Sequence, residues 1–291
     1  MAVNRLMTAM VTPLDEEFNV NFTEAERLAI YLAEHGNDGI VVCGTTGESP
    51  TISTEDKIQL FRVVKEAVGN KATVIAGIGT NCTESSIALA REAERAGVDE
   101  LMAVVPYYNK PSQEGLYQHF RAIAESTSLP VMLYNIPGRT SINLLPETVK
   151  RLSEIKNITS IKEAAGSMDQ VSELKGILPS DFRIYSGDDS LTLPMLALGC
   201  DGIVSVAGHV VGDEIKKMID AWFAGDHQTA LKWHLKLMPL FKGIFVTTNP
   251  VPIKYLLQKV GLNAGGVKLP LAPATPEEKA FLDETYKKVK G

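Results

Sequence analysis

Short apolar runs alternate with longer amphipathic stretches through the first 225 residues of the chain. We expect the runs to be strands, over residues 6–12, 39–43, 73–78, 100–105, 131–135, 158–162, 182–186 and 202–206. The stretches between and after them have helical periodicity, over residues 23–35, 54–68, 83–96, 113–127, 146–155, 168–178, 191–198 and 212–224. Thr54 and Thr83 are expected to cap two of these helices.

Eight such units in about 220 residues, with strands that are apolar on both faces, favour a (β/α)8 TIM barrel over an open doubly wound sheet. No GxGxxG fingerprint follows the first strand, which argues against a dinucleotide-binding fold. After residue 225 the strands stop, and residues 227–245, 250–261 and 276–290 predict three further helices. We therefore expect a barrel domain over residues 1–225 and a C-terminal three-helix extension over residues 226–291.

The composition excludes several classes of partner and cofactor. With 45% hydrophobic and 22% charged residues, and a net charge of -6, the chain is typical of a globular protein without a nucleic-acid or membrane partner. The N-terminal residues lack a signal-peptide pattern, so we expect a cytoplasmic protein. The three cysteines, Cys43, Cys82 and Cys200, and the five histidines show no metal-ligand spacing; we expect no metal, and buried, unreactive thiols.

Polar residues gather where the predicted strands end, which is where a TIM barrel builds its active site. They lie in CGTTGES (43–49), PYYNKPS (106–112), LYNIPGRTS (133–141) and SGDDS (186–190), and at Lys162. Asp188 and Asp189 precede a predicted helix and are interpreted as an N-terminal cap without chemistry.

Lys162 is a lone amine at the end of the apolar run ITSIK. Apolar barrel walls would desolvate it and favour the neutral, nucleophilic form, although a strand-end lysine can also extend into solvent. Tyr134 and Tyr108 are phenols at strand ends that could move protons beside it, whereas Tyr107 is expected to lie at the core margin. A neutral lysine forms an imine with a ketone or aldehyde, so the pattern indicates a Schiff-base lyase or aldolase that needs no metal or organic cofactor.

Two further groups could bind a carboxylate. The Gly44-Thr45-Thr46-Gly47 turn can direct successive backbone N–H groups at an anion, or it can be an ordinary turn between strand and helix. Arg139 is expected in a loop too tightly turned for a helix. Its planar guanidinium suits a carboxylate, and the alternative is a surface arginine.

Several motifs, in order, carry a resemblance that runs from about residue 6 to the C-terminal helices: GTTGES (44–49), PYYNKPSQEGLYQHF (106–120), LYNIPGRT (133–140), IKEA (161–164), SGDD (186–189) and NPVPIK (249–254). Together they resemble the 4-hydroxy-tetrahydrodipicolinate synthase, or dihydrodipicolinate synthase, family of class I pyruvate-dependent aldolases. The resemblance implies that Lys162 forms the imine with pyruvate and that Tyr134 gives and takes protons beside it. It also implies that Thr45 and Tyr108 complete a proton relay, with Tyr108 supplied across a dimer interface.

The same resemblance implies the remaining contacts. Thr46 and the main chain of Val204 would bind pyruvate, and Arg139 would bind the carboxylate of L-aspartate 4-semialdehyde. The implied reaction is the committed step of lysine and diaminopimelate biosynthesis, carried out by a homotetramer built as a dimer of dimers.

The chain departs from the family at the site where some members bind inhibitory lysine. Two histidines and a glutamate of that site correspond here to Thr54, Lys57 and Ser85, while Ser49, Asn81 and Tyr107 fit. Because a cation at Lys57 should repel a lysine ligand, the sequence predicts weak or absent feedback inhibition.

Two other functions stay open. N-acetylneuraminate lyases and 2-keto-3-deoxy sugar acid aldolases share the lysine and the tyrosine, but a sugar pocket has less use for the carboxylate-binding Arg139. A binding protein that kept the barrel without catalysis is the other alternative.

Overall fold

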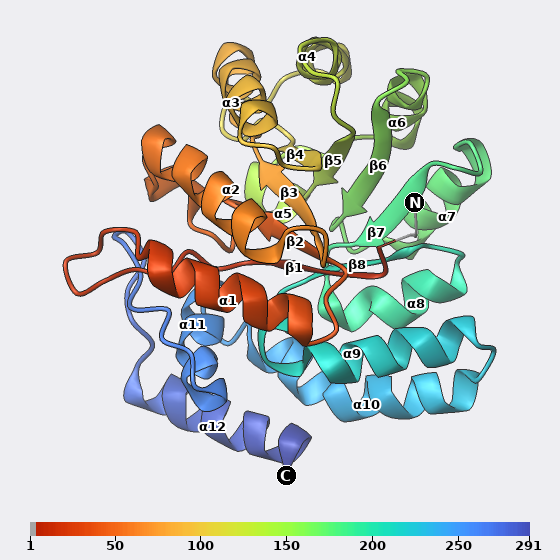
Figure 1. The fold of residues 1–291 in the computed structure, drawn as a ribbon. Helices are drawn as coiled ribbons and strands as arrows, with labels where there is room; N and C mark the ends of the chain where they lie inside the picture. Colours follow the sequence, from red (N-terminus) through yellow and green to blue (C-terminus); the bar gives the residue numbers. More distant parts are fainter. Residues whose placement is uncertain (1–3) are drawn as a thin grey trace.

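The computed structural model of the protein describes residues 4–291. Its parallel strands close into a barrel in chain order, and β1 pairs with β8 (Figure 1). The strands are β1 (Leu6–Ala9), β2 (Gly39–Val42), β3 (Thr73–Gly77), β4 (Glu100–Val104), β5 (Val131–Asn135), β6 (Ile158–Glu163), β7 (Arg183–Ser186) and β8 (Gly202–Ser205). The predicted TIM barrel is therefore confirmed, and β6 runs one residue beyond the predicted strand.

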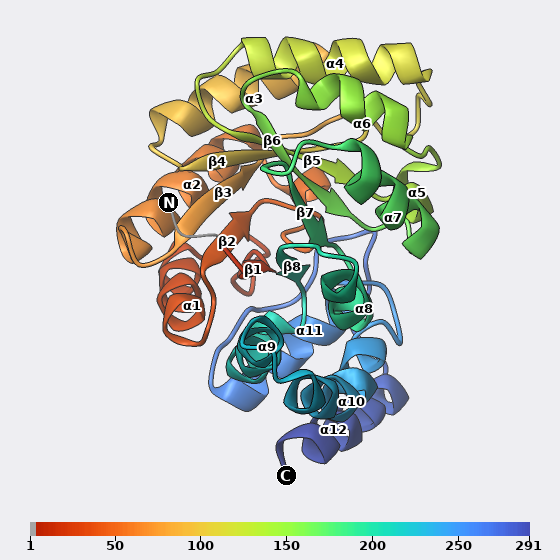
Figure 2. The ribbon, with the colours of Figure 1, turned by 90° about the vertical axis from the view of Figure 1, so that its right-hand side faces the viewer.

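Helices cover the outside of the barrel (Figures 1 and 2). They are α1 (Phe22–Glu34), α2 (Thr54–Val68), α3 (Thr83–Arg95), α4 (Gln113–Glu125), α6 (Pro146–Ser153), α7 (Met168–Ile177), α8 (Thr192–Ala197) and α9 (Gly208–Phe223). The single helical turn α5 (Pro137–Thr140) directly follows the C-terminal end of β5. Short 3-10 turns are η1 (Ser49–Thr51), η2 (Asp189–Leu191) and η3 (Gln258–Val260). The two predicted caps are wrong by one residue. Ser53, not Thr54, accepts a hydrogen bond from the backbone N–H of Asp56, and Cys82 precedes α3 without a side-chain cap.

The strands are buried because each contributes side chains to two apolar layers. The layer inside the barrel consists of Met7, Ala9, Val41, Ile75, Met102, Met132, Tyr134, Tyr185 and Val204. The larger layer lies between strands and helices and includes Leu6, Ile40, Val74, Leu101, Leu133 and Ile161. Successive strand residues thus face opposite layers, which is why the strand sequences show no polar alternation.

The C-terminal region forms α10 (His227–Gly243), α11 (Val251–Leu257) and α12 (Pro276–Lys290), as the sequence predicts. Helix α10 packs against α9 on one side and α12 on the other, so the extension lies beside the last barrel helix (Figure 2). The division into two domains at residue 225 stays a prediction. Within residues 4–291, no helix is both long and apolar enough to cross a membrane.

Candidate active site

Lys162 lies near the end of β6, inside the mouth of the barrel, and is 5% exposed. The register of β5 and β6 places it opposite Tyr134, which is 3% exposed. The Lys162 Nζ atom lies 4.2 Å from the centroid of the Tyr134 ring. The structure thus brings together the two residues that the sequence proposes as nucleophile and proton carrier, and it rejects a solvent-extended lysine.

Gly187, just after β7, leaves room for the lysine side chain. A Cβ atom at this position would lie 3.2 Å from the Cε atom of Lys162 and 2.7 Å from the Cβ atom of Ala164. Sequence reasoning missed this role, although the glycine stands in the SGDD motif at a strand end. The sequence feature that could have revealed this role is a glycine in a strand-end loop where functional residues were already expected.

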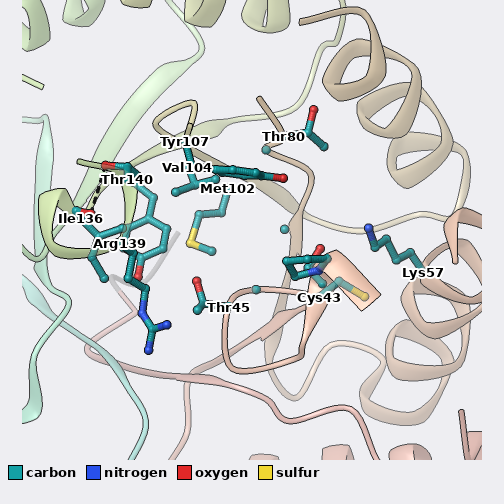
Figure 3. A pocket seen from close by; sticks show the side chains of 16 residues that line it. Cys43, Thr45, Lys57, Thr80, Met102, Val104, Tyr107, Ile136, Arg139 and Thr140 are labelled. Carbon is teal, nitrogen blue, oxygen red and sulfur yellow. Dashed lines mark hydrogen bonds between the residues drawn. The ribbon is translucent and has the colours of Figure 1, made fainter. Parts of the chain in front are cut away.

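A cavity of about 220 Å³ opens beside Tyr134 at this end of the barrel (Figure 3). Of the predicted site residues, Thr45, Tyr134 and Arg139 line it, and Tyr107 and Lys57 contribute further polar side chains. Lys162 does not line the cavity itself. Its amine lies over the ring of Tyr134, which does line the cavity. The cavity has room for a small carbonyl compound with a carboxylate.

Arg139 belongs to a helix and not to a loop, which corrects the prediction. Pro137 begins the single helical turn of α5, and Ser141 ends it with a left-handed backbone, φ 61°. The Thr140 hydroxyl shares its hydrogen between the carbonyls of Ile136, at 3.1 Å, and Ile142, at 2.9 Å, and stabilises this turn. Arg139 is exposed, lines the cavity, and has no acidic partner within residues 4–291, so its guanidinium is available to a bound carboxylate.

The loop after β2 forms a compact turn that buries Thr46. The backbone N–H of Gly47 donates to the Gly44 carbonyl at 3.1 Å, and that of Glu48 donates to Thr45 at 3.0 Å. The Thr46 hydroxyl, 2% exposed, accepts a hydrogen bond from Nδ2 of Asn249 at 2.9 Å. Asn249 lies 203 residues away in sequence, and no local pattern could have predicted this contact.

Thr46, Val204 and Tyr108, like Lys162, are not among the residues that line the cavity. Val204 in β8 is 1% exposed and packs in the same inner layer as Tyr134. Tyr108 has a left-handed backbone, φ 76°, is 88% exposed, and does not line the cavity of its own chain. Tyr107, expected only at the core margin, is the tyrosine of this pair that lines the cavity.

Asn135 and Glu163, which directly follow Tyr134 and Lys162 in the sequence, belong to a buried polar network. The Glu163 carboxylate accepts hydrogen bonds from Asn135 Nδ2 at 3.0 Å, Gln170 Nε2 at 3.0 Å and the Ala165 backbone at 2.6 Å. Burial raises the pKa of Glu163, and the hydrogen bonds oppose that shift. Because Asn135 and Glu163 are paired in the strand register, this network fixes the relative position of β5 and β6.

Asp188 and Asp189 differ from each other. Asp188 caps η2 through the Ser190 backbone N–H, as expected for a cap. Asp189 is 2% exposed and accepts hydrogen bonds from the Ser205 hydroxyl and from the backbone N–H groups of Val206 and Ala207. Burial raises its pKa to about 6. Asp189 therefore holds the end of β8, a role that the sequence prediction did not include.

The expectation of three buried cysteines is correct for two of them. Burial raises the pKa of Cys43 and of Cys200 to about 12. Cys82 is exposed at the start of α3, where hydrogen bonds from Ser85 lower its pKa. Among the described residues, 4–291, no group of three or more His, Cys, Asp or Glu side chains could hold a metal ion.

Comparison with known proteins agrees with this geometry. The model of the dihydrodipicolinate synthetase family matches residues 2–289. A 4-hydroxy-tetrahydrodipicolinate synthase of Desulforamulus reducens is 62% identical over 275 residues, covering 94% of this chain and 93% of the relative.

Two crystal structures have the same fold. Dihydrodipicolinate synthase from Bacillus anthracis is 49% identical with a TM-score of 0.96, covering 99% of this chain and 98% of its own. The enzyme from Cyanidioschyzon merolae with lysine bound is 44% identical with a TM-score of 0.97, at the same coverage. The chain therefore belongs to the dihydrodipicolinate synthetase family.

Proposed function

We propose that the protein condenses pyruvate with L-aspartate 4-semialdehyde to give 4-hydroxy-tetrahydrodipicolinate, in lysine and diaminopimelate biosynthesis. The observation that carries the proposal is the buried amine of Lys162, whose Nζ lies 4.2 Å from the Tyr134 ring centroid. The cavity beside that ring is lined by Thr45 and by Arg139. The names of the relatives support the choice of substrates.

The first half of the reaction takes place on Lys162. Its neutral Nζ attacks the C2 carbonyl of pyruvate, water leaves, and a protonated imine forms. Loss of a proton from the pyruvate methyl group gives an enamine, with the imine as the electron sink. Tyr134 is the group next to the amine that can deliver and remove these protons, and Thr45 lies on the same cavity wall. We assign Thr46 and the main chain of Val204 to the pyruvate carboxylate.

In the second half, the enamine carbon attacks the aldehyde carbon of the semialdehyde and a new carbon–carbon bond forms. The amine of that substrate then attacks C2, closes the ring and displaces Lys162. One water is released for each pair of substrates. Arg139, free of acidic partners within residues 4–291, is the group that binds the semialdehyde carboxylate.

We further propose that Tyr108 acts in the site of a neighbouring chain within a homotetramer. Its left-handed backbone, φ 76°, is uncommon for a bulky residue, and the residue is 88% exposed. Mixing Lys162→Ala chains with Tyr108→Phe chains tests this. Shared sites restore part of the activity in the mixture, whereas activity no higher than the sum of the two variants contradicts sharing.

Mass spectrometry after borohydride reduction in the presence of pyruvate tests the central step. We expect one reduced pyruvate adduct on Lys162 and none on Lys162→Met, together with turnover of pyruvate plus the semialdehyde in a coupled assay. Cleavage of N-acetylneuraminate without turnover of the semialdehyde would assign the chain to the sugar acid aldolases instead. Absence of any adduct would reject the Schiff-base mechanism.

A further inference from the structure

Two motifs far apart in the chain contact each other next to the proposed pyruvate site. The first is the loop of residues 44–49 (GTTGES), and the second is the start of the C-terminal extension, residues 249–254 (NPVPIK). Asn249 donates to the Thr46 hydroxyl at 2.9 Å, and Lys254 Nζ lies 2.6 Å from Oε1 of Glu48. Thr46 has a role in the reaction proposed above, whereas Asn249, Glu48 and Lys254 have none yet.

The ion pair between Glu48 and Lys254 is almost fully buried, with side chains 2% and 3% exposed. The second oxygen of Glu48 accepts from the Lys268 backbone N–H at 2.9 Å, and Lys254 also donates to the Gly266 carbonyl at 2.7 Å. A buried pair of this kind is costly to desolvate, so its presence is weak evidence for a role in stability. It connects the loop to the segment of residues 249–268 at several points.

The hydrogen bond from Asn249 fixes what the Thr46 hydroxyl can do. Because the Thr46 oxygen accepts an N–H from Asn249, the hydroxyl hydrogen stays available for another acceptor. An anionic carboxylate is a strong acceptor for such a group. The contact with Asn249 thus leaves Thr46 as a hydrogen-bond donor. The Thr12 hydroxyl stabilises the same loop, because it donates to the Gly47 carbonyl at 2.7 Å.

We propose that Asn249 and the Glu48–Lys254 ion pair are positioning residues that hold loop 44–49 so that Thr46 donates to the carboxylate of pyruvate. The inference rests on the function proposed above, which places pyruvate at this loop. It makes the C-terminal extension part of the active site, although none of its residues touches the reacting atoms.

A double-mutant cycle tests the role of Asn249. Asn249→Ala and Thr46→Ala should each raise the KM for pyruvate about 10-fold, which is the loss expected for a hydrogen bond to a charged group. The KM for the semialdehyde should change less than about 2-fold. The double variant should be no worse than Thr46→Ala, since Asn249 acts through Thr46. Multiplicative effects, or an unchanged pyruvate KM in Asn249→Ala, would contradict the proposal.

The role of the Glu48–Lys254 ion pair has to be tested with a variant that still folds. Removing one partner leaves a buried charge and can unfold the chain, whereas an apolar replacement of both is often tolerated. In the double variant Glu48→Leu/Lys254→Met we expect a folded protein with a pyruvate KM raised at least about 5-fold. Lys259→Met is the matched control, because it removes a more exposed ion pair of the same extension, with Asp283 at 2.8 Å. It should leave the pyruvate KM unchanged.

The outcomes separate this inference from the proposed function. If the unmodified protein gives no borohydride-trapped pyruvate adduct, the proposed function fails. If it forms the adduct and turns over, but Asn249→Ala binds pyruvate as tightly as the unmodified protein, only the positioning role fails. Should the ion-pair variant not fold, the Asn249 cycle still decides the question.

Discussion

Lys162 and Tyr134 face each other across neighbouring strands, with the lysine Nζ 4.2 Å from the centre of the tyrosine ring. Both side chains are buried at the barrel mouth, where the apolar inner layer ends. The aromatic ring packs against the amine and orients it, and the phenol is the group that can carry protons in the proposed reaction. One tyrosine can therefore both orient the amine and serve its chemistry.

Tyr134→Phe separates these two roles, because it keeps the ring and removes the hydroxyl. We expect kcat to fall about 100-fold to 1000-fold, the usual contribution of a general acid or base, while the melting temperature stays nearly unchanged. The pyruvate adduct on Lys162 should still accumulate, but more slowly. Single-turnover trapping with borohydride measures this rate, and an unchanged rate would exclude Tyr134 as the proton carrier.

Arg139→Ala should affect the two substrates differently. The guanidinium lines the cavity without an acidic partner within residues 4–291, so its removal should raise the KM for the semialdehyde about 10-fold or more. Formation of the pyruvate adduct should change less than about 2-fold. Steady-state kinetics with each substrate varied, together with trapping, test this. Equal losses for both substrates would contradict the assigned role.

Gly187→Ala should place a methyl group against the side chain of Lys162, the proposed nucleophile. The added Cβ atom would lie 3.2 Å from Cε of Lys162 and 2.7 Å from the Cβ atom of Ala164, closer than such atoms normally approach. We expect the rate of adduct formation to fall about 10-fold or more, because the amine must shift from its place over Tyr134. Gly138→Ala is a suitable control, since a Cβ atom there meets nothing within 4 Å.

The chain should lose stability as pH rises through neutrality because of Glu100. Burial raises the pKa of this partly buried carboxyl at the start of β4 to about 7, above the value of about 4.3 in an unfolded chain. Its contribution is fully present below about pH 4.3 and is lost as pH rises through 7. Glu100→Gln should therefore be neutral near pH 4 and raise Tm by about 2–5 °C near pH 8. An equal Tm difference at both pH values would contradict this assignment.

L-Lysine should inhibit weakly. Lys57 lines the cavity beside Tyr134 and also a second cavity with Thr54 and Ser85, so a basic side chain lies where the family resemblance would place a lysine ligand. We expect less than about half of the activity to be lost at about 1 mM L-lysine, and stronger inhibition of the variant Thr54→His/Lys57→His/Ser85→Glu. Nearly complete inhibition of the unmodified protein at that concentration would contradict the prediction.

The sequence predicts the barrel well because every strand is a short apolar run, and polar residues gather at the C-terminal ends of five of them. That pattern identifies Lys162, Tyr134, Thr45 and Arg139 before any coordinates are considered. Chemistry at strand ends is visible in the sequence because the fold places all those ends at one rim.

What the sequence could not predict depends on contacts between distant segments. The bond from Asn249 to Thr46 joins residues of different motifs, and the burial of Asp189 depends on how β8 lies beside it. Neither the exposure of Cys82 nor the helical turn at Arg139 follows from the residue types alone. Local pattern thus finds the groups that react, whereas the residues that hold them appear only in three dimensions.

The hydrogen bond between Asn249 and Thr46 also affects when the site can form during synthesis of the chain. Ribosomes add about 5–20 residues per second, so the 203 residues between these partners take about 10–40 s to synthesise. Strand β8, which pairs with β1 in the closed barrel, is synthesised almost as long after β1. A nascent chain therefore carries Lys162 before the proposed carboxylate-binding loop can gain its contact with Asn249, and the proposed site is complete only after residue 249 has been synthesised.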